Sequence, residues 1–288
     1  MKELEGQLGK ANDKKETTPF QAGRDFVVRT ALHQYWKVGE LSPHAQHYFS
    51  SRFAPAVCRG EKLSLAETAE NLLFGFEFVP NGSAEIPTEG PVVVVGNHWR
   101  NGPMRGMWEH GLISKVMRDI RDQEVHWLIQ DRLEFLRTGR EMPGTAYVNS
   151  LLAKTFDGVV ITAPFKIERA KRKGRRDNFK FPVRAIRELR SGGVIGCYPE
   201  ASTSESLIQA WEGSRVLVRG LSKLQPDTKV VPVGGFSKEK HLFLNFGQPF
   251  LIGDALKSEA RPQDVLMYQI ATLLPRELRG YYGGISSR

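Results

Sequence analysis

Short apolar runs that stop at glycine, proline or polar residues recur along the chain and predict the strands of a sheet. The clearest run is PVVVV at residues 91–95, which Gly96 ends. A continuous stretch of β-branched residues is typical of a parallel strand that is buried on both faces. The same pattern predicts further strands over residues 74–79, 124–129, 158–162, 194–198 and 229–233, and a more exposed, alternating strand over residues 242–246.

Segments with apolar residues at helical spacing precede and separate these strands. Ser191-Gly192-Gly193 is a strong stop signal at the end of one of them. Because strands and helices alternate, the sequence predicts βαβ crossovers and an α/β fold with a mostly parallel sheet flanked by helices. The predicted helices cover residues 43–53, 63–74, 108–122, 183–190, 207–224 and 262–274.

The chain before this alternating pattern predicts two further parts. Residues 1–19 carry few apolar and many charged side chains, which predicts a disordered N-terminal tail. Residues 20–74 predict an N-terminal helical segment, in which Ser64 and Glu67 fit a capping box. Its aromatic and basic side chains suit a surface lying on a membrane, and packing against the α/β domain explains the mixture at least as well. The α/β domain is expected over residues 75–288.

Composition and charge narrow the classes of function. The 288 residues are 40% hydrophobic, enough for a full core, and no apolar run approaches the ~20 residues that span a bilayer. The net charge of +9 and the pI of about 9.6 favour an anionic partner, such as nucleic acid, an anionic membrane, a phosphorylated cofactor or an acidic carrier protein. Cys58 and Cys197 lack metal-ligand spacing, and a buried reduced thiol is expected at Cys197, which fits a cytoplasmic protein.

Polar residues with catalytic potential follow three of the predicted strands. Since ligands bind beyond the carboxyl ends of parallel strands, these residues should meet at one edge of the sheet. From its position alone, His98 is either a general base or a cap of the following helix. The three sets are Asn97, His98, Arg100 and Asn101, then Gln130, Asp131 and Arg132, then Pro199 to Ser204.

Familiar phosphate and hydrolase motifs are missing. The chain has no GxGxxG after its first strands and no GxxxxGK[ST], so a nucleotide phosphate cradle is not predicted. It also has no GxSxG, which argues against an α/β-hydrolase.

Several segments, taken in order, resemble the glycerophospholipid acyltransferases of the lysophosphatidate type. GNH at residues 96–98 follows one strand, YPEASTS at 198–204 matches the family's FPEGTRS block, and VVPVG at 230–234 forms a later strand. AWEGSRVLV, with Gly213, and the late segment LPRELRGYYG also resemble the family. The resemblance covers roughly residues 75–283 and implies an α/β fold with a helical segment that meets the membrane.

The resemblance implies an enzyme of phospholipid biosynthesis that moves a fatty acyl group from acyl-CoA or acyl carrier protein to a hydroxyl of a lipid-like acceptor. It makes His98 the general base and keeps the block's glutamate as Glu200, which a helix-start carboxylate would also explain. It implies no metal and no resident cofactor. We expect a peripheral protein on an anionic membrane in the cytoplasm. Net charge and the basic segment 166–176 would also suit nucleic acid, but the chain has no recognised nucleic-acid-binding module, so no nucleic acid partner is expected. The expected substrate-binding residues are Asn97, Arg100, Asn101, Lys166, Ser202, Thr203 and Ser204.

One departure from the family pattern keeps a second interpretation open. The family has an aspartate five residues after the histidine, where it orients the ring, and this chain has Pro103 there. Asp131 is the leading substitute, although a helix cap explains it as well, and Asn101 is a neutral candidate; Glu109 is expected to point away. If no acid replaces the aspartate, the chain is a non-catalytic lipid- or thioester-binding protein of the same fold.

Other departures concern the phosphate of the acceptor. The arginine of the family's block is Thr203 here, and its glycine is Ala201. A second arginine of the family is also missing, and Lys166 is the nearest cation to its place. We therefore expect an acceptor other than glycerol 3-phosphate or lysophosphatidate. The basic segment 166–176 either binds anions, such as CoA phosphates, a carrier protein or lipid headgroups, or is a solvated loop.

Overall fold

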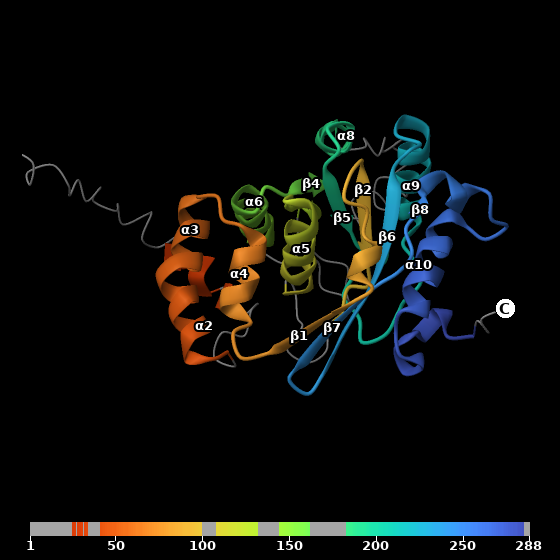
Figure 1. Ribbon diagram of the computed structural model, residues 1–288. Helices are drawn as coiled ribbons and strands as arrows, with labels where there is room; N and C mark the ends of the chain where they lie inside the picture. The colour runs from red at the N-terminus through yellow and green to blue at the C-terminus, as the bar shows by residue number, and fades with distance from the viewer. Residues whose placement is uncertain are drawn as a thin grey trace, which may run out of the picture.

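The computed structural model describes residues 25–26, 28–30, 32–33, 41–99, 108–131, 144–161 and 183–284. Within these ranges, eight strands form one sheet that lies between two layers of helices (Figure 1). The helices α5 and α6 lie on one side of the sheet, α9 and α10 lie on the other, and α2, α3 and α4 pack outside α5. The fold is therefore α/β, as the alternation of predicted strands and helices requires.

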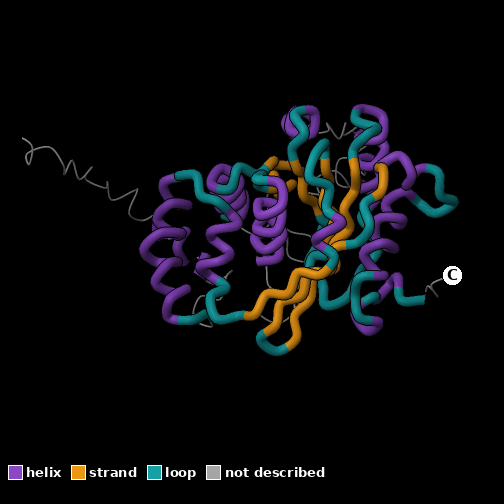
Figure 2. The backbone as a smooth tube through the Cα atoms, viewed as in Figure 1, coloured by secondary structure: helices purple, strands orange, loops and turns teal. Residues whose placement is uncertain are grey.

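Figure 2 distinguishes the helices, strands and loops of the described residues by colour. The helices are α2 (Pro43–Tyr48), a π-helical turn (Phe49–Phe53), α3 (Ala54–Arg59), α4 (Leu65–Leu72), α5 (Trp108–Arg121), α6 (Thr145–Thr155), α8 (Val183–Arg190), α9 (Glu212–Leu224) and α10 (Pro262–Thr272). The strands are β1 (Glu77–Asn81), β2 (Val92–Gly96), β3 (Val125–Gln130), β4 (Val159–Ile161), β5 (Val194–Cys197), β6 (Lys229–Lys238), β7 (His241–Phe246) and β8 (Phe250–Leu251). Short 3₁₀ turns cover Ser83–Glu85, Ile252–Leu256, Arg276–Leu278 and Gly280–Tyr282.

Strand β2 lies near the middle of the sheet. The strand order is β1-β7-β6-β2-β5-β3-β4, and β8 pairs with β6. The neighbours of β2, which are β5 and β6, both run parallel to it, whereas β6 pairs in antiparallel fashion with β7 and β8. The sheet is thus mostly parallel.

The valines of β2 divide the core into two halves. Val92 and Val94 belong to the cluster that also holds buried side chains of α4, α5 and α6. Val93 and Val95 belong to the cluster on the opposite face, with side chains of α8, α9 and α10. Successive side chains of a strand point to opposite faces of the sheet. Because both faces are covered by helices, every position of this strand is apolar, which explains its unbroken β-branched run.

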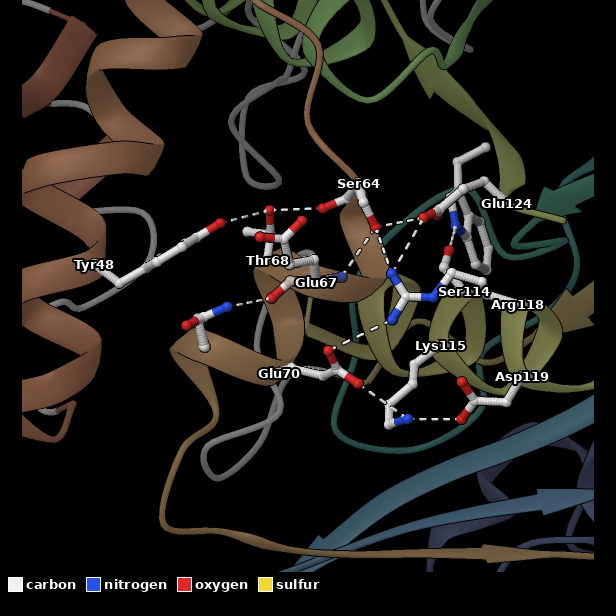
Figure 3. A network of polar contacts seen from close by, with 12 residues as sticks. Tyr48, Ser64, Glu67, Thr68, Glu70, Ser114, Lys115, Arg118, Asp119 and Glu124 are labelled. Carbon is white, nitrogen blue, oxygen red and sulfur yellow. Dashed lines mark hydrogen bonds and ion pairs between the residues drawn. The ribbon is translucent and has the colours of Figure 1, made fainter. Parts of the chain in front are cut away.

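Helices α4 and α5 are held together by a close contact and by a polar network. Ser64 caps α4, since its hydroxyl accepts a hydrogen bond from the Glu67 amide at 3.0 Å. The same hydroxyl contacts Glu124 and, at 3.0 Å, Arg118 of α5 (Figure 3). Beneath this network, a Cβ built on Gly111 would lie 2.4 Å from the Cβ of Ala69. The absent side chain at Gly111 therefore sets the spacing of the two helices.

The structure places several predicted elements differently. The first strand begins at Glu77 rather than residue 74, because the chain turns after α4 and the Phe76 amide bonds to the Leu73 carbonyl. Helix α6 was not expected, because the apolar and polar residues of its sequence are poorly segregated. The helix expected over residues 207–224 begins only at Glu212.

Tertiary hydrogen bonds explain the late start of α9. The amide of Leu207 donates to the Leu278 carbonyl at 2.9 Å, and the amide of Ala210 donates to the Tyr282 hydroxyl at 2.9 Å. The Tyr282 hydroxyl in turn donates to Asp264 at 2.8 Å. The amides of Leu207 and Ala210 therefore bond to residues later in the chain and do not form the hydrogen bonds of a helix.

Two smaller expectations concern membrane spans and thiols. None of the helices in the ranges given above has the length and apolarity that a bilayer crossing requires. Cys58 and Cys197 are buried and form no disulfide, and burial raises the pKa of Cys197 to about 12. The expected buried, reduced thiol at Cys197 is confirmed.

We predict that Gly111→Ala destabilises the protein, although alanine normally favours a helix over glycine by about 1 kcal/mol. The new methyl group would overlap the side chain of Ala69, and overpacking typically costs about 1–3 kcal/mol. Gly253→Ala is the matched control, because a Cβ there meets only the Ser222 hydroxyl at 3.5 Å. Urea unfolding measures both, and equal stability of the two variants would contradict the prediction.

Candidate active site

The carboxyl ends of β2, β5 and β3 lie side by side, because β5 pairs with β2 on one side and with β3 on the other. All three strands are parallel, so the segments that follow them leave the sheet at the same edge. A further bridge between Trp99 and Ser204 extends the pairing beyond the ends of β2 and β5. The predicted convergence at one sheet edge is confirmed for the described members of the three sets, whereas Arg100, Asn101 and Arg132 lie outside the described residues.

Asn97 ties the end of β2 to β6. Its side-chain amide donates to the Gly235 carbonyl at 2.8 Å, and its oxygen accepts from the Gly235 amide at 2.7 Å. The residue is buried. Both ends of the Asn97 side chain are thus committed to the fold, a structural role that differs from the substrate contact expected from the sequence.

The carboxyl group of Glu200 joins the segment after β2 to the loop after β5. Its Oε2 accepts a hydrogen bond from the His98 amide at 2.9 Å, and its Oε1 accepts one from the Ile208 amide at 2.8 Å. The Ser204 amide donates to the His98 carbonyl at 3.1 Å, which adds a second link between the two segments. Because α9 begins only at Glu212, Glu200 is not the helix-start carboxylate that was the alternative explanation.

Glu200 is almost completely buried, and this changes its acidity. Burial raises its pKa from 4.5 to about 7, although hydrogen bonds from Ile208, His98 and Ser204 favour the ionised form. The Ser204 hydroxyl lies 2.6 Å from the Ser206 carbonyl oxygen and 3.4 Å from Glu200 Oε1, and its proton can be donated to either oxygen.

The loop after Glu200 keeps a glycine-like conformation without a glycine. Ala201 has a φ of +53°, which lies in the left-handed region that glycine adopts without cost. The side chain of Gln130, at the end of β3, donates to the Ala201 carbonyl at 2.9 Å and supports this turn. Ser202 and Thr203, the next residues of the expected substrate-binding set, are partly exposed at the edge of the sheet.

Glu109 corrects an expectation drawn from the sequence. It was expected to point away, but it lies in the first turn of α5, is buried, and its Oε2 accepts from the Trp99 amide at 3.4 Å. A Cβ on Gly235 would lie 2.4 Å from Glu109 Oε1, so the glycine makes room for the carboxyl group. A glycine within a strand often marks such a close approach, and this signal could have identified the contact.

Two buried carboxyl groups therefore bind two consecutive amides. Glu200 accepts from His98 and Glu109 accepts from Trp99. Burial raises the pKa of Glu109 well above its usual value, and the nearby charge of Glu200 raises it further, against the Trp99 hydrogen bond. Together the two acids hold the backbone that carries the candidate base.

The ring of His98 is surrounded by aromatic groups. It stacks on Tyr198, with ring centroids 4.5 Å apart and planes inclined by 15°. Its Nδ1 is buried and has no hydrogen-bond partner in the described part of the chain, while the residue as a whole stays partly exposed. Burial lowers the pKa of His98 to about 4, so the ring is neutral at pH 7.

Asp131 is not brought to the His98 ring. It follows β3, which is two strands away from β2, a separation of about 10 Å between the strands. Its amide donates to the Ile161 carbonyl at 2.8 Å, and no hydrogen bond joins its side chain to His98 among the residues that the structure describes. The proposed substitution of Asp131 for the missing aspartate thus lacks the contact it would need.

Three of the expected substrate-binding residues cannot be placed. Arg100, Asn101 and Lys166 lie outside the described residues, as do Pro103 and the basic segment 166–176.

Comparisons with known proteins give no family assignment. No family model matches the chain, and no curated protein matches it. Among solved structures, the chain is similar to the crystal structure of the 1-acyl-sn-glycerophosphate (LPA) acyltransferase PlsC from Thermotoga maritima. The similarity covers 93% of this chain and 98% of that one, with 15% identity and a TM-score of 0.43. A likeness this distant does not assign an activity to the site.

We predict that Glu200 makes stability depend on pH. Its raised pKa means that the folded chain holds a proton between pH 4.5 and about 7 that the unfolded chain releases. The contribution of this proton to the free energy of unfolding is complete below pH 4.5 and is lost as the pH rises through 7. The loss is at most about 3 kcal/mol.

Glu200→Gln removes this titration and serves as the comparison. Urea unfolding at pH 5 and pH 8 should show wild type losing free energy of unfolding relative to the glutamine variant. Other titrating groups contribute to both proteins and cancel in the difference. The same pH dependence in both proteins would show that Glu200 keeps an ordinary pKa.

Proposed function

We propose that this protein is an O-acyltransferase that moves a fatty acyl group from a thioester, acyl-CoA or acyl carrier protein, to a hydroxyl of a lipid or lipid-like acceptor. The observation that carries the proposal is the bond from the His98 amide to Glu200. It joins the GNH and YPEAS segments, which carry the sequence resemblance, at the open edge of the sheet. The third segment, VVPVG, lies in β6, on the other side of β2.

His98 is the general base in this proposal. Its neutral ring accepts the proton of the acceptor hydroxyl while that oxygen attacks the carbonyl carbon of the thioester. A carbon–oxygen bond forms, the carbon–sulfur bond then breaks, and the departing thiolate takes the proton from the imidazolium. The products are an ester and a free thiol, and His98 returns to its neutral form.

Charge supports two further parts of the proposal, the kind of acceptor and the membrane surface at which the protein acts. Thr203 stands where the resembling family has a phosphate-binding arginine, which supports an acceptor without a phosphate near this loop. The net charge of +9 supports action at an anionic membrane surface on the cytoplasmic side, where lipid acceptors are found. Both statements belong to the proposal.

A second candidate function is binding of a lipid or thioester without catalysis. The unpaired, buried Nδ1 of His98 favours it, because the carboxylate that usually orients a catalytic histidine is missing among the described residues. A pKa of about 4 also makes the ring a weak base at neutral pH. Turnover of a thioester decides between the two candidates.

We predict that His98→Ala lowers acyl transfer by about 10²–10⁴-fold, the usual contribution of a positioned base. The assay follows labelled acyl-CoA and acyl carrier protein with a panel of hydroxyl acceptors. His47→Ala, an exposed histidine on α2, is the matched control and should keep wild-type transfer. Because the base must be neutral, kcat/KM should rise with pH around a midpoint near 4 and then level off.

Two results would overturn this assignment. Wild-type turnover in His98→Ala would remove His98 as the base. Saturable binding of acyl-CoA to wild type with no transfer to any acceptor would instead establish the non-catalytic binding protein.

We predict that phosphate-free alcohols are better acceptors than glycerol 3-phosphate or lysophosphatidate. A single charged hydrogen bond contributes about 1.5–3 kcal/mol, so its absence at Thr203 should lower kcat/KM for phosphate acceptors about tenfold or more. Thr203→Arg should recover part of that difference, with Thr203→Gln as the uncharged control. Preference of wild type for a phosphate acceptor would contradict the prediction.

A further inference from the structure

Four aromatic rings form a continuous cluster behind the candidate base. His98 stacks on Tyr198 at 4.5 Å, and Tyr198 stacks on Trp127 at 5.2 Å with planes inclined by only 10°. The ring of His110, from α5, is inclined to the other three rings. Its centroid lies 4.4 Å from that of Trp127, 4.6 Å from that of Tyr198 and 5.5 Å from that of His98. The rings come from the segments directly after β2 and β5, from β3 and from α5, so the tertiary fold assembles the stack.

Glycines on two adjacent strands make room for the cluster. Trp127 of β3 stands opposite Gly196 of β5, and a Cβ on Gly196 would lie 2.5 Å from the indole ring. A Cβ on Gly96, at the end of β2, would lie 3.1 Å from the Tyr198 ring. The rings therefore lie close against the backbone of the sheet, and the indole is fixed by a hydrogen bond to Ser114 at 3.0 Å.

Among the residues that the structure describes, no polar group forms a hydrogen bond that would orient the His98 ring. Its Nδ1 is buried without a hydrogen bond to any described residue, and the hydrogen bonds that His98 forms within the described part of the chain are made by its backbone. An offset stack favours parallel planes, and in a packed cluster it restricts rotation about the bond that carries the ring. Stacking is thus the interaction available to set the plane of the imidazole.

We propose that Tyr198 is the positioning residue of the base: its ring, held by Trp127 and His110, fixes the plane of His98 in place of an orienting carboxylate. The assignment rests on the proposed role of His98 as the base. In this proposal Tyr198, the first residue of the YPEAS segment, supports catalysis by positioning His98 and transfers no proton itself. The assignment also accounts for a catalytic histidine in a chain that has Pro103 at the position of the orienting acid.

The stack also controls the protonation of His98. In the described ranges, the titratable groups around it are Tyr198 and His110 beside the ring, Glu200 at its own amide and Glu109 at the next amide. The two carboxyl groups bind the backbone, and the pKa of His98 is lowered by burial alone. Removing the covering ring should therefore move the pKa of His98 upward, toward the ordinary value of about 6.5.

Two measurements on the full chain test the proposal. In Tyr198→Leu, the ring-current shift and the lowered pKa of His98, both followed by NMR, should be lost. Transfer should show a kcat lowered about 10²-fold, the cost of a small misplacement, with KM changed less than about threefold. Tyr198→Phe keeps the ring and should restore the NMR signature and most of kcat.

A smaller change tests the proposal in case Tyr198→Leu does not fold. Gly96→Ala deletes nothing but pushes a methyl group against the edge of Tyr198. It should shift the His98 resonances and lower kcat by a smaller factor than Tyr198→Leu, while the melting temperature shows that the fold is retained.

The outcomes separate this proposal from the proposed function. Unchanged His98 resonances and pKa in folded Tyr198→Leu would overturn the stacking role, whatever the enzyme does. A changed NMR signature with wild-type kcat would also overturn it, because the plane of the ring would then not matter for transfer. Wild-type transfer in His98→Ala would instead overturn the base assignment, and the positioning role with it.

Discussion

The site depends on one buried contact, in which the carboxyl group of Glu200 accepts the amide of His98. Parallel pairing brings β2 and β5 together, and beyond the strand ends it continues as the bridge between Trp99 and Ser204. Glu200 adds a side-chain link at this place, and its other oxygen accepts a hydrogen bond from the Ile208 amide. The cost is a carboxyl group removed from water, which raises its pKa to about 7.

Further contacts around the His98 backbone and ring complete the site. With the backbone of His98 held from one side, Glu109 binds the next amide from beneath, in space that Gly235 leaves open. The aromatic rings lie against Gly96 and Gly196 and cover the imidazole. Among the described residues, the hydrogen bonds of this region hold the backbone of His98, while aromatic packing acts on its ring. This division of tasks differs from the carboxylate–histidine pair of a triad.

Sequence reasoning was correct where a local pattern has one physical cause. The β-branched run before Gly96 is apolar at every position because both faces of β2 are covered, and so a strand buried on both faces was predictable. The stop at Ser191-Gly192-Gly193 and the cap at Ser64 also depend only on neighbouring residues. The helix expected from residue 207 was wrong at its start, because the amides there bind residues some 70 positions later, Leu278 and Tyr282.

By itself, the sequence determined the α/β class, the parallel strands and the meeting of His98 and Glu200 at one edge, because these follow from periodicity and from the direction of parallel strands. Only the tertiary structure decided which groups touch the base. The stack of Tyr198 on His98 joins positions 100 residues apart, and the inward turn of Glu109 depends on where α5 begins. Such contacts arise from strand order, register and the space that glycines leave, and none of these has a local pattern that a single sequence displays.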